Sequence, residues 1–214
     1  TNTGGTIAAF NTMDMKANSI TNQGGLIGGN KASDITLRTT GDLNNIGGTL
    51  RGGNLALDVG GNLNSQTTTY HTQTGDMSIK DRRGYASVRD GIDQIANIQA
   101  LDADRVKTYT DAEGKAQSYT QTALNVQTKG DINLKATQVD SAGSSYMAGE
   151  NINLTTVNTG FAENAVYSWS RKNKHSTTRS DTAEIGSSIN SQGDNTLIAQ
   201  NDINLRNVAL NADK

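Results

Sequence analysis

The stretch that decides the fold is GDINLKATQVDSAGSSYMAGENINLTT, residues 130–156, in which one short unit occurs twice. Asp131-Ile132-Asn133-Leu134 returns as Asn151-Ile152-Asn153-Leu154, and near the end of the chain as Asp202-Ile203-Asn204-Leu205. Self-similarity at a fixed period, here about 20 residues, is the signature of repeat architectures.

The same offset relates segments of the N-terminal third. Residues 34–37 align with residues 54–57, and residues 41–44 align with residues 61–64. Residues 24–30 are similar to residues 47–54 with one residue inserted. The repeat therefore extends well beyond the quoted stretch.

The unit Gly-[Asp/Asn]-[Ile/Leu]-x indicates a very short strand after a corner. Residues i and i+2 of a strand point to the same face, and Gly, Asp and Asn tolerate the left-handed backbone of a corner. A helix is disfavoured because Gly, Asn and Thr are poor helix formers. We expect inward side chains at Ile132, Leu134, Ile152, Leu154, Ile203 and Leu205, and outward ones at Asn133, Asn153 and Asn204.

A period near 20 with three short strands and three corners describes one coil of a parallel β-helix. Successive coils stack at about 4.8 Å, so identical positions lie above one another. This arrangement predicts that Ile132 pairs in parallel with Ile152. No coil buries its apolar face alone, so stability comes from stacking.

The composition agrees with a thin core. The chain has 214 residues, 33% of them hydrophobic and 4% aromatic, against an average of roughly 45–50% apolar when Gly is counted. Disorder would also give a low apolar content, but the apolar/polar alternation and a net charge of −2 argue against it. Absence of Pro fits strands paired on both sides, and absence of Cys excludes disulfides.

The same composition limits the partners and the cellular context. The net charge does not favour nucleic acid, which binds basic surfaces. No stretch reaches the roughly 20 apolar residues of a membrane-spanning helix. The chain begins at Thr1 without an initiator Met or a signal-peptide pattern. We expect residues 1–214 to form a single repeat domain, an interior fragment of a longer protein.

Residues 66–129 break the pattern, and we expect an irregular excursion there. Residues 75–79 resemble one further repeat unit. Ile92, Ile95, Ile98 and Leu101 are spaced by three, which is compatible with a short helix or with irregular coils. Residues 105–109 and 116–122 flank a turn at residues 111–115, which predicts a β-hairpin.

Residues 161–184 form the second break. Residues 165–170 alternate in polarity, a basic run follows at residues 171–175, and residues 176–179 are again β-like. The pattern predicts a hairpin that protrudes from the stack and carries a basic tip.

Residues 52–66, 130–143 and 187–212 together resemble the haemagglutinin repeats of filamentous-haemagglutinin-type exoproteins, the secreted partners of two-partner secretion systems. That family includes adhesins, haemolysins and the effectors of contact-dependent growth inhibition. The resemblance covers roughly two thirds of the chain. It implies a right-handed parallel β-helix, export through an outer-membrane two-partner secretion transporter, and display at the bacterial cell surface or release.

On this resemblance the chain is a structural stalk or adhesive segment that holds other parts away from the cell. The implied partners are the transporter, engaged through an N-terminal domain not evident in this sequence, and a receptor or glycan on a host cell or a neighbouring bacterium. The rival interpretation is a carbohydrate-active enzyme, because parallel β-helices also include pectin-degrading enzymes.

Residues with catalytic or metal-binding chemistry are sparse. His71 and His175 are the only histidines, so a His-based metal or nucleophilic site is not expected. The repeat places carboxylates at corners, where they cap turns: Asp42, Asp58, Asp131, Asp194 and Asp202. Residues 52–58 match a calcium-binding nonapeptide poorly, and no Gly-Lys-Ser/Thr follows the glycine-rich stretches. We therefore predict no enzyme activity, cofactor or metal.

The protruding hairpin holds the best candidate for surface binding. Lys and Arg beside exposed aromatic residues suit anionic glycans or lipopolysaccharide, although a short charged run is usually a solvated face. The candidate residues are Tyr167, Trp169, Arg171, Lys172, Lys174 and Arg179.

Overall fold

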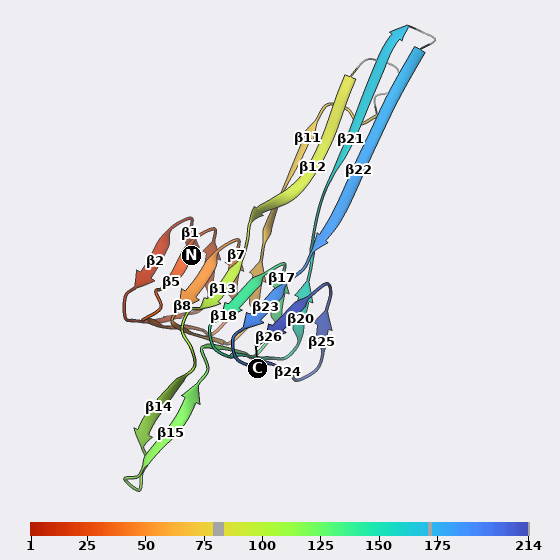
Figure 1. Ribbon diagram of the computed structural model, residues 1–214. Coiled ribbons are helices and arrows are strands. Elements are labelled where there is room, and N and C mark those ends of the chain that lie inside the picture. Colours follow the sequence, from red (N-terminus) through yellow and green to blue (C-terminus); the bar gives the residue numbers. More distant parts are fainter. Residues whose placement is uncertain (79–83, 171–172, 214) are drawn as a thin grey trace.

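The computed structural model describes residues 1–78, 84–170 and 173–213, and within these ranges the chain forms strands and no helix. At residues 168–170, 173 and 174 only the backbone is described. Three parallel sheets make up the body of the molecule (Figure 1).

The first sheet has seven strands: β1 (Asn2–Thr3), β4 (Ile20–Gln23), β7 (Leu43–Ile46), β10 (Leu63–Gln66), β17 (Ile132–Lys135), β20 (Ile152–Thr155) and β25 (Ile203–Leu205). The second also has seven: β2 (Thr6–Ala9), β5 (Leu26–Gly29), β8 (Thr49–Gly52), β13 (Asn97–Ala100), β18 (Gln138–Ser141), β23 (Ser188–Ser191) and β26 (Ala209–Ala212). The third has six: β3 (Thr12–Ala17), β6 (Asp34–Thr39), β9 (Asn54–Val59), β16 (Leu124–Thr128), β19 (Ser145–Gly149) and β24 (Asn195–Ala199).

The chain passes through the first, second and third sheets in turn. Each round of three strands forms one coil, and the coils stack as a parallel β-helix. Ile132 lies opposite Ile152, and Leu134 lies opposite Leu154. The predicted fold class and the predicted register between these units are both confirmed. We call this body the stack.

Most of the interior of the stack is apolar, and its buried apolar side chains form one cluster. Ile132, Leu134, Ile152 and Leu154 are fully buried, as predicted. Ile203 and Leu205 keep the same register against β20, but they are 45% and 47% exposed. The prediction that these two are buried is wrong, because β25 is the outermost strand of its sheet and no strand covers its other side within the described residues.

Part of the interior is polar. Asn22 and Asn45 are fully buried at the positions where later coils carry Leu134 and Leu154. Asn22 Nδ2 donates to Asn45 Oδ1 at 2.9 Å, and each amide also donates to the backbone carbonyl three residues further on. These bonds satisfy the buried amide groups, which would otherwise destabilise the fold.

The outward asparagines form a second ladder, in the orientation that the sequence predicts. Asn64, Asn133, Asn153 and Asn204 each donate to the asparagine of the preceding coil at 2.9 Å, beginning at Asn44. Identical amides stacked in register satisfy one another, which explains why the unit keeps Asn at this position.

The corner before the first sheet differs from the sequence-based expectation. The backbone there is not recorded as left-handed at Gly41, Gly61 or Gly130. Instead each Asp or Asn after the glycine accepts the backbone N–H of its equivalent on the next coil, as Asp42 Oδ1 does from Asn62 at 2.8 Å. A Cβ on Gly61 would lie 2.3 Å from that carboxylate oxygen. Glycine here makes room for the acceptor.

The left-handed backbone occurs at the next corner, between the first and second sheets. It is found at Gly4, Gly24, Gly47, Ala136 and Asn207, which belong to five different coils. In the two remaining coils the corner is replaced by long hairpins. This corner is therefore where the stack accepts its two longer insertions.

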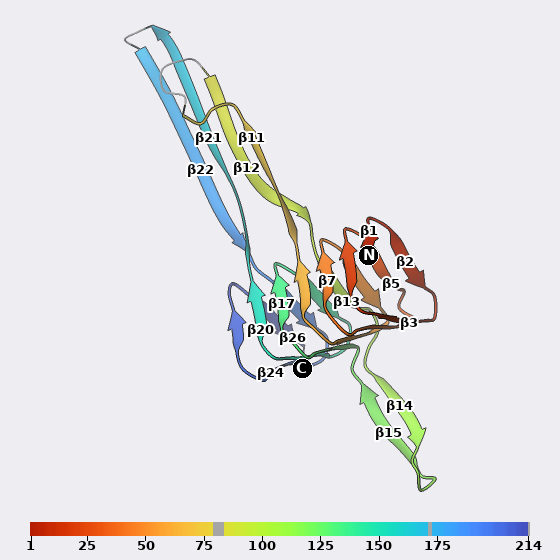
Figure 2. The ribbon, with the colours of Figure 1, turned by 180° about the vertical axis from the view of Figure 1, so that it is seen from behind.

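The first insertion at this corner is the hairpin β11 (Thr68–Thr74) and β12 (Gly84–Gln94), and the second is β21 (Val157–Ser170) and β22 (Asn173–Ile185). They leave coils that are two apart and join side by side, because β12 pairs antiparallel with β21. The result is a four-stranded antiparallel sheet that projects from the stack (Figures 1 and 2). We call it the projecting sheet.

A third hairpin, β14 (Arg105–Thr110) and β15 (Ala116–Gln121), confirms the pairing predicted for residues 105–122. It leaves the stack between the second and third sheets and extends in the opposite direction (Figure 1).

Residues 66–129 are thus not one irregular excursion. They contain two hairpins and two regular strands of the stack, β13 and β16. The helix considered for residues 92–101 is absent, since Ile92 lies in β12 and Ile98 in β13. Residues 75–78 are not a repeat unit but part of the connection after β11, and Ile79 lies outside the described residues.

Candidate binding surface on the projecting sheet

Four of the six predicted binding residues, Tyr167, Trp169, Lys174 and Arg179, lie on the strands of the β21–β22 hairpin. Tyr167 is exposed on β21 opposite His175, and Arg179 is exposed on β22 opposite Glu163. Trp169 and Lys174 lie on these strands, where only the backbone is described, and the register shifts between Ser168 and Ser170. Arg171 and Lys172 lie outside the described residues.

The two faces of the projecting sheet are unlike one another. On one face Ala86 and Val166 are buried. The connection after β11 covers them, because Asn164 Nδ2 donates to the carbonyl of Met77 at 2.9 Å and Gly75 packs against Ala86. We call this the covered face.

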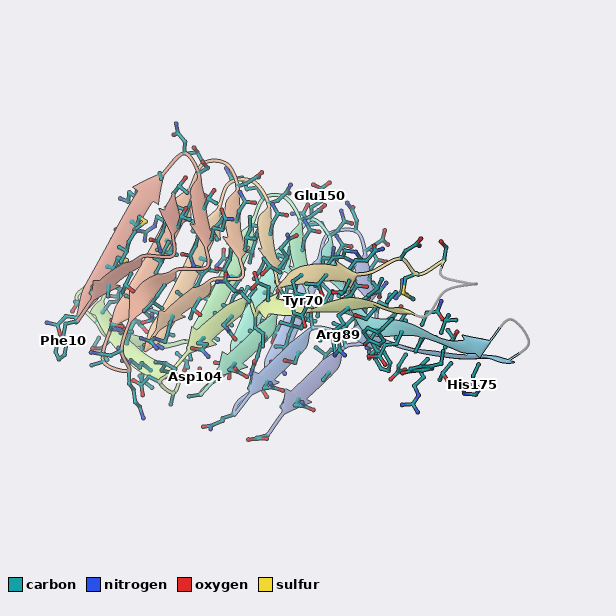
Figure 3. The ribbon with its side chains drawn as sticks, turned by 90° about the horizontal axis from the view of Figure 1, so that it is seen from above. Phe10, Tyr70, Arg89, Asp104, Glu150 and His175 are labelled. Carbon is teal, nitrogen blue, oxygen red and sulfur yellow. The ribbon has the colours of Figure 1, made fainter. Side chains whose placement is uncertain are left out.

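The other face, which we call the open face, carries the aromatic side chains. Tyr70 is 45% exposed, Tyr85 50%, Phe161 36% and Tyr167 45%. Cross-strand pairing puts these residues on the same side, since Arg89 is opposite Thr72 and Phe161, and alternate residues share a face. Figure 3 shows Tyr70 and Arg89 toward the base of the sheet and His175 near its far end.

Charged groups between the aromatic rings are held by hydrogen bonds. Glu163 Oε1 accepts from the Tyr85 hydroxyl and from the Arg89 guanidinium, both at 3.0 Å. Arg179 and Asp181 are exposed on the neighbouring strand. These four charged residues carry two positive and two negative charges, so the charges around the aromatic side chains of the open face are equal in number.

Ion pairs and hydrogen bonds fix the base of the β14–β15 hairpin to the stack. Arg105 bonds Asp102 at 2.7 Å and Asp34 at 2.5 Å. The Arg105 hydrogen bond holds the pKa of Asp102 below its usual value. Asp104 accepts from the backbone N–H groups of Ala123 and Ser144 at 2.9 and 2.8 Å. Further out, the exposed rings of Tyr109 and Tyr119 lie 6.3 Å apart.

The turn of this hairpin is held in the same way. Gln117 and the backbone of Lys115 donate to Asp111, and these bonds lower the pKa of its carboxyl. The described contacts of this hairpin thus account for its shape.

The carboxylates of Asp42 and Asp131 accept hydrogen bonds from the next coil, whereas Asp194 and Asp202 take part through their backbone N–H groups. Asp131 accepts from Asn151 at 2.8 Å, and the backbone N–H of Asp202 bonds Asn151 at 3.3 Å. The backbone N–H of Asp194 bonds Ser144. Asp58 is an exception to the predicted corner positions, because it is exposed on strand β9 and not at a corner.

Several surface depressions lie along the stack. One of about 330 Å³ is lined by Gln99, Asp140, Asn190 and Asn211 among others. Asp140 accepts from Gln138 and Asn190, and Asn190 accepts from Asn211. The Asp140 carboxylate is therefore engaged in a ladder, and Asp213 lines the same depression.

Neither histidine belongs to a metal or nucleophilic cluster within residues 1–78, 84–170 and 173–213, where no group of three or more His, Cys, Asp or Glu could hold a metal ion. His71 Nδ1 lies 2.7 Å from Asp90 Oδ1 in an exposed cross-strand pair, and His175 Nε2 lies 3.5 Å from Thr177 Oγ1. The described residues contain no helix long and apolar enough to cross a membrane.

Comparisons of the chain with family models, with curated proteins and with solved structures give no match. The fold and the surface geometry are therefore the basis for a functional proposal, together with the resemblance seen in the repeats.

Sequence reasoning missed Tyr70, Tyr85, Arg89 and Phe161 as parts of one surface. Alternation within residues 84–90 and 157–163 was a usable signal for strands, but nothing in either segment indicates that the two hairpins pair with each other. That pairing depends on their leaving the same corner two coils apart.

Proposed function

We propose that this chain is a structural segment of a secreted bacterial cell-surface exoprotein, in which the stack is a stalk and the projecting sheet makes an adhesive contact. The strands of the stack bond one another from coil to coil, although the buried side-chain amide of Asn54 has no hydrogen-bond partner among the described residues. The projecting sheet, which carries the exposed aromatic residues, stands away from the stack (Figure 2). Scaffolds of this kind carry their contacts in insertions, because the coils must stay regular.

The observation that carries the proposal is that the projecting sheet buries small side chains and exposes large aromatic ones. Its covered face buries Ala86 and Val166, whereas the larger aromatic residues are on the open face. Scattered exposed apolar residues are normal, but several on one face indicate an interaction surface. Tyr and Arg are also the residues that dominate binding surfaces.

The partner we propose is a glycan of a host cell or a neighbouring bacterium. Sugar rings present apolar C–H faces beside hydroxyl groups, and the open face offers aromatic rings beside Arg89, Glu163, Arg179 and Asp181. Basic residues at the tip, Arg171, Lys172 and Lys174, would add attraction for anionic glycans that weakens as salt screens it. Export by a two-partner secretion transporter belongs to the same proposal through the resemblance of the repeats.

The test is attachment of the purified chain to printed neutral and anionic glycans and to lipopolysaccharide-coated surfaces. Replacing Tyr85, Phe161 and Tyr167 with Ser should reduce attachment about tenfold or more, since each ring belongs to the contact. The matched control replaces Tyr109 and Tyr119 with Ser, which removes exposed rings from the opposite hairpin. Equal attachment by the two variants would contradict the proposal.

A second variant examines the tip. Changing Arg171, Lys172 and Lys174 together to Ser should weaken attachment to anionic glycans at low salt and leave neutral glycans unaffected. Wild-type attachment at low salt would remove the basic tip from the binding surface. Release of sugar products from any printed glycan would instead favour the rival class, a carbohydrate-active enzyme.

A further inference from the structure

Strand β22 forms an open edge of the projecting sheet. The strand order is β11-β12-β21-β22, so β22 has a neighbour on one side only within the described residues. It has 13 residues, Asn173–Ile185. It pairs regularly with β21 from Lys174 to Ile185, and the register shifts only at its start, opposite Ser168–Ser170. Unpaired edges of this length are templates for another strand.

The backbone groups that face outward can be identified from the contacts at the base. Asn207 Nδ2 donates to the carbonyl of Glu184 at 2.8 Å from outside the sheet, whereas Thr159 Oγ1 bonds the carbonyl of Ala183 from the β21 side at 3.4 Å. Antiparallel strands alternate between inward and outward groups. The outward groups therefore belong to Lys174, Ser176, Thr178, Ser180 and Thr182, and we call residues 174–182 the free edge.

The free edge has side chains that admit a second strand. Ser176, Thr178, Ser180 and Thr182 are small, exposed and on one face. The chain has no Pro that would block the ladder. The shorter edge at the other side of the sheet, β11, has seven residues and an irregular register at Thr68–Thr69, so β22 is the better template.

We infer that the free edge pairs with the free edge of a second copy of this chain, antiparallel, with a twofold axis at Thr178. This register uses every outward group from Lys174 to Thr182 and stops before Glu184, where Asn207 already occupies the edge. Five residue pairs with two bonds each would form about ten backbone hydrogen bonds. The projecting sheets of two copies then become one eight-stranded sheet.

Charge complementarity supports this register. On the open face, Asp181 of one copy lies opposite His175 of the other, and Arg179 lies opposite Thr177, so no like charges face each other. Shifting the axis to Arg179 or Asp181 would oppose two identical charges, which destabilises a strand pair. The interface is small, so the association is weak and visible at high protein concentration.

Cysteine cross-linking tests the register directly, because the chain has no Cys. In Thr178→Cys the two thiols lie opposite each other, with Cα atoms about 5.5 Å apart, within the disulfide range. In Ser180→Cys the thiols are displaced by four residues, about 13 Å. We expect disulfide-linked dimer from the first variant and monomer from the second under one glutathione redox buffer. Cross-linking of Ser180→Cys but not Thr178→Cys would overturn the register.

Sedimentation of the cysteine-free chain tests the association itself. The mass should rise from 22.6 kDa toward twice that value as concentration increases from micromolar toward millimolar. Thr178→Pro removes an outward N–H and leaves the β21 bonds in place, so it should weaken self-association by about tenfold, while Thr178→Ala should not. Monomer at every concentration, or equal association of the Pro and Ala variants, would overturn the inference.

Discussion

The stack and the projecting sheet differ in how their strands are paired and in which side chains they expose. In the stack every strand except those of the first and last coils lies between equivalent strands, apolar groups point inward, and asparagine and aspartate side chains bond one another from coil to coil. In the projecting sheet the strands have no equivalents in other coils, the edge strands β11 and β22 each have one neighbour among the described residues, and the large aromatic residues are exposed. Regular repetition gives the protein its rigidity, and the departures from it give the protein a surface for contacts.

The largest expected effect comes from a charge inside the stack. Leu154→Asp places a carboxylate in the fully buried position between Leu134 and Leu205 and should lower the free energy of unfolding by about 4–5 kcal/mol. Leu205→Asp is the matched control, because Leu205 has the same register but is half exposed, and it should cost about 1 kcal/mol or less. Urea denaturation of both variants measures the difference. Similar losses would contradict the assigned interior.

Substitutions in the buried asparagine ladder should destabilise the protein more than substitutions in the half-exposed outer ladder. Asn45→Ala removes buried hydrogen bonds to Gly48, Ser65 and Asn97 and takes away the oxygen to which the buried Asn22 amide donates, so we expect a loss of about 2–3 kcal/mol. Asn133→Ala, in the half-exposed outer ladder, should cost about 1 kcal/mol or less because water replaces the amide. Thermal unfolding monitored by circular dichroism compares them. A larger loss at Asn133 would reverse the assignment of inner and outer ladders.

A smaller effect is expected at the base of the β14–β15 hairpin. The Arg105 hydrogen bond lowers the pKa of Asp102 from 3.8. A lowered folded-state pKa means that the carboxylate stabilises the hairpin above about pH 4 and that this contribution is lost as the pH falls through the folded-state value. Hydrogen exchange of residues 105–121, corrected for intrinsic rates, should show faster opening at pH 3 than at pH 5. Asp102→Asn should reduce that pH dependence, and the part that remains is expected from Asp111, whose pKa is also lowered.

The sequence allowed prediction of the stack in some detail because its interactions recur at equivalent positions. Ile132 predicts Ile152, and the register follows from the offset alone. Buried Asn22 and Asn45 were not foreseen, because an outward and an inward asparagine look alike until the bonds to Gly25 and Gly48 are seen. The glycine of the Gly-Asp corners was expected to provide a left-handed backbone. It instead makes room for a carboxylate of the neighbouring coil.

The candidate surface was only partly predictable. Tyr167 and Arg179 lie on the open face as members of a hairpin that the alternation indicated. Phe161 and Arg89 meet across β12 and β21, which are joined by neither a short turn nor a repeat. Their pairing follows from a corner shared by two coils, and this is a property of the stacked molecule rather than of either segment.

Removing both long hairpins is the most direct test of the division between a self-sufficient stack and a presented sheet. Residues 69–93 and 158–184 would each be replaced by Asn-Gly, since Thr68 pairs with Gln94 and Val157 pairs with Ile185, close enough for a two-residue turn. The shortened chain should keep its β-sheet circular dichroism and a melting temperature within a few degrees of the full chain, and it should lose attachment to glycans. A shortened chain that fails to fold, or one that folds and attaches as well as the full chain, would contradict the account.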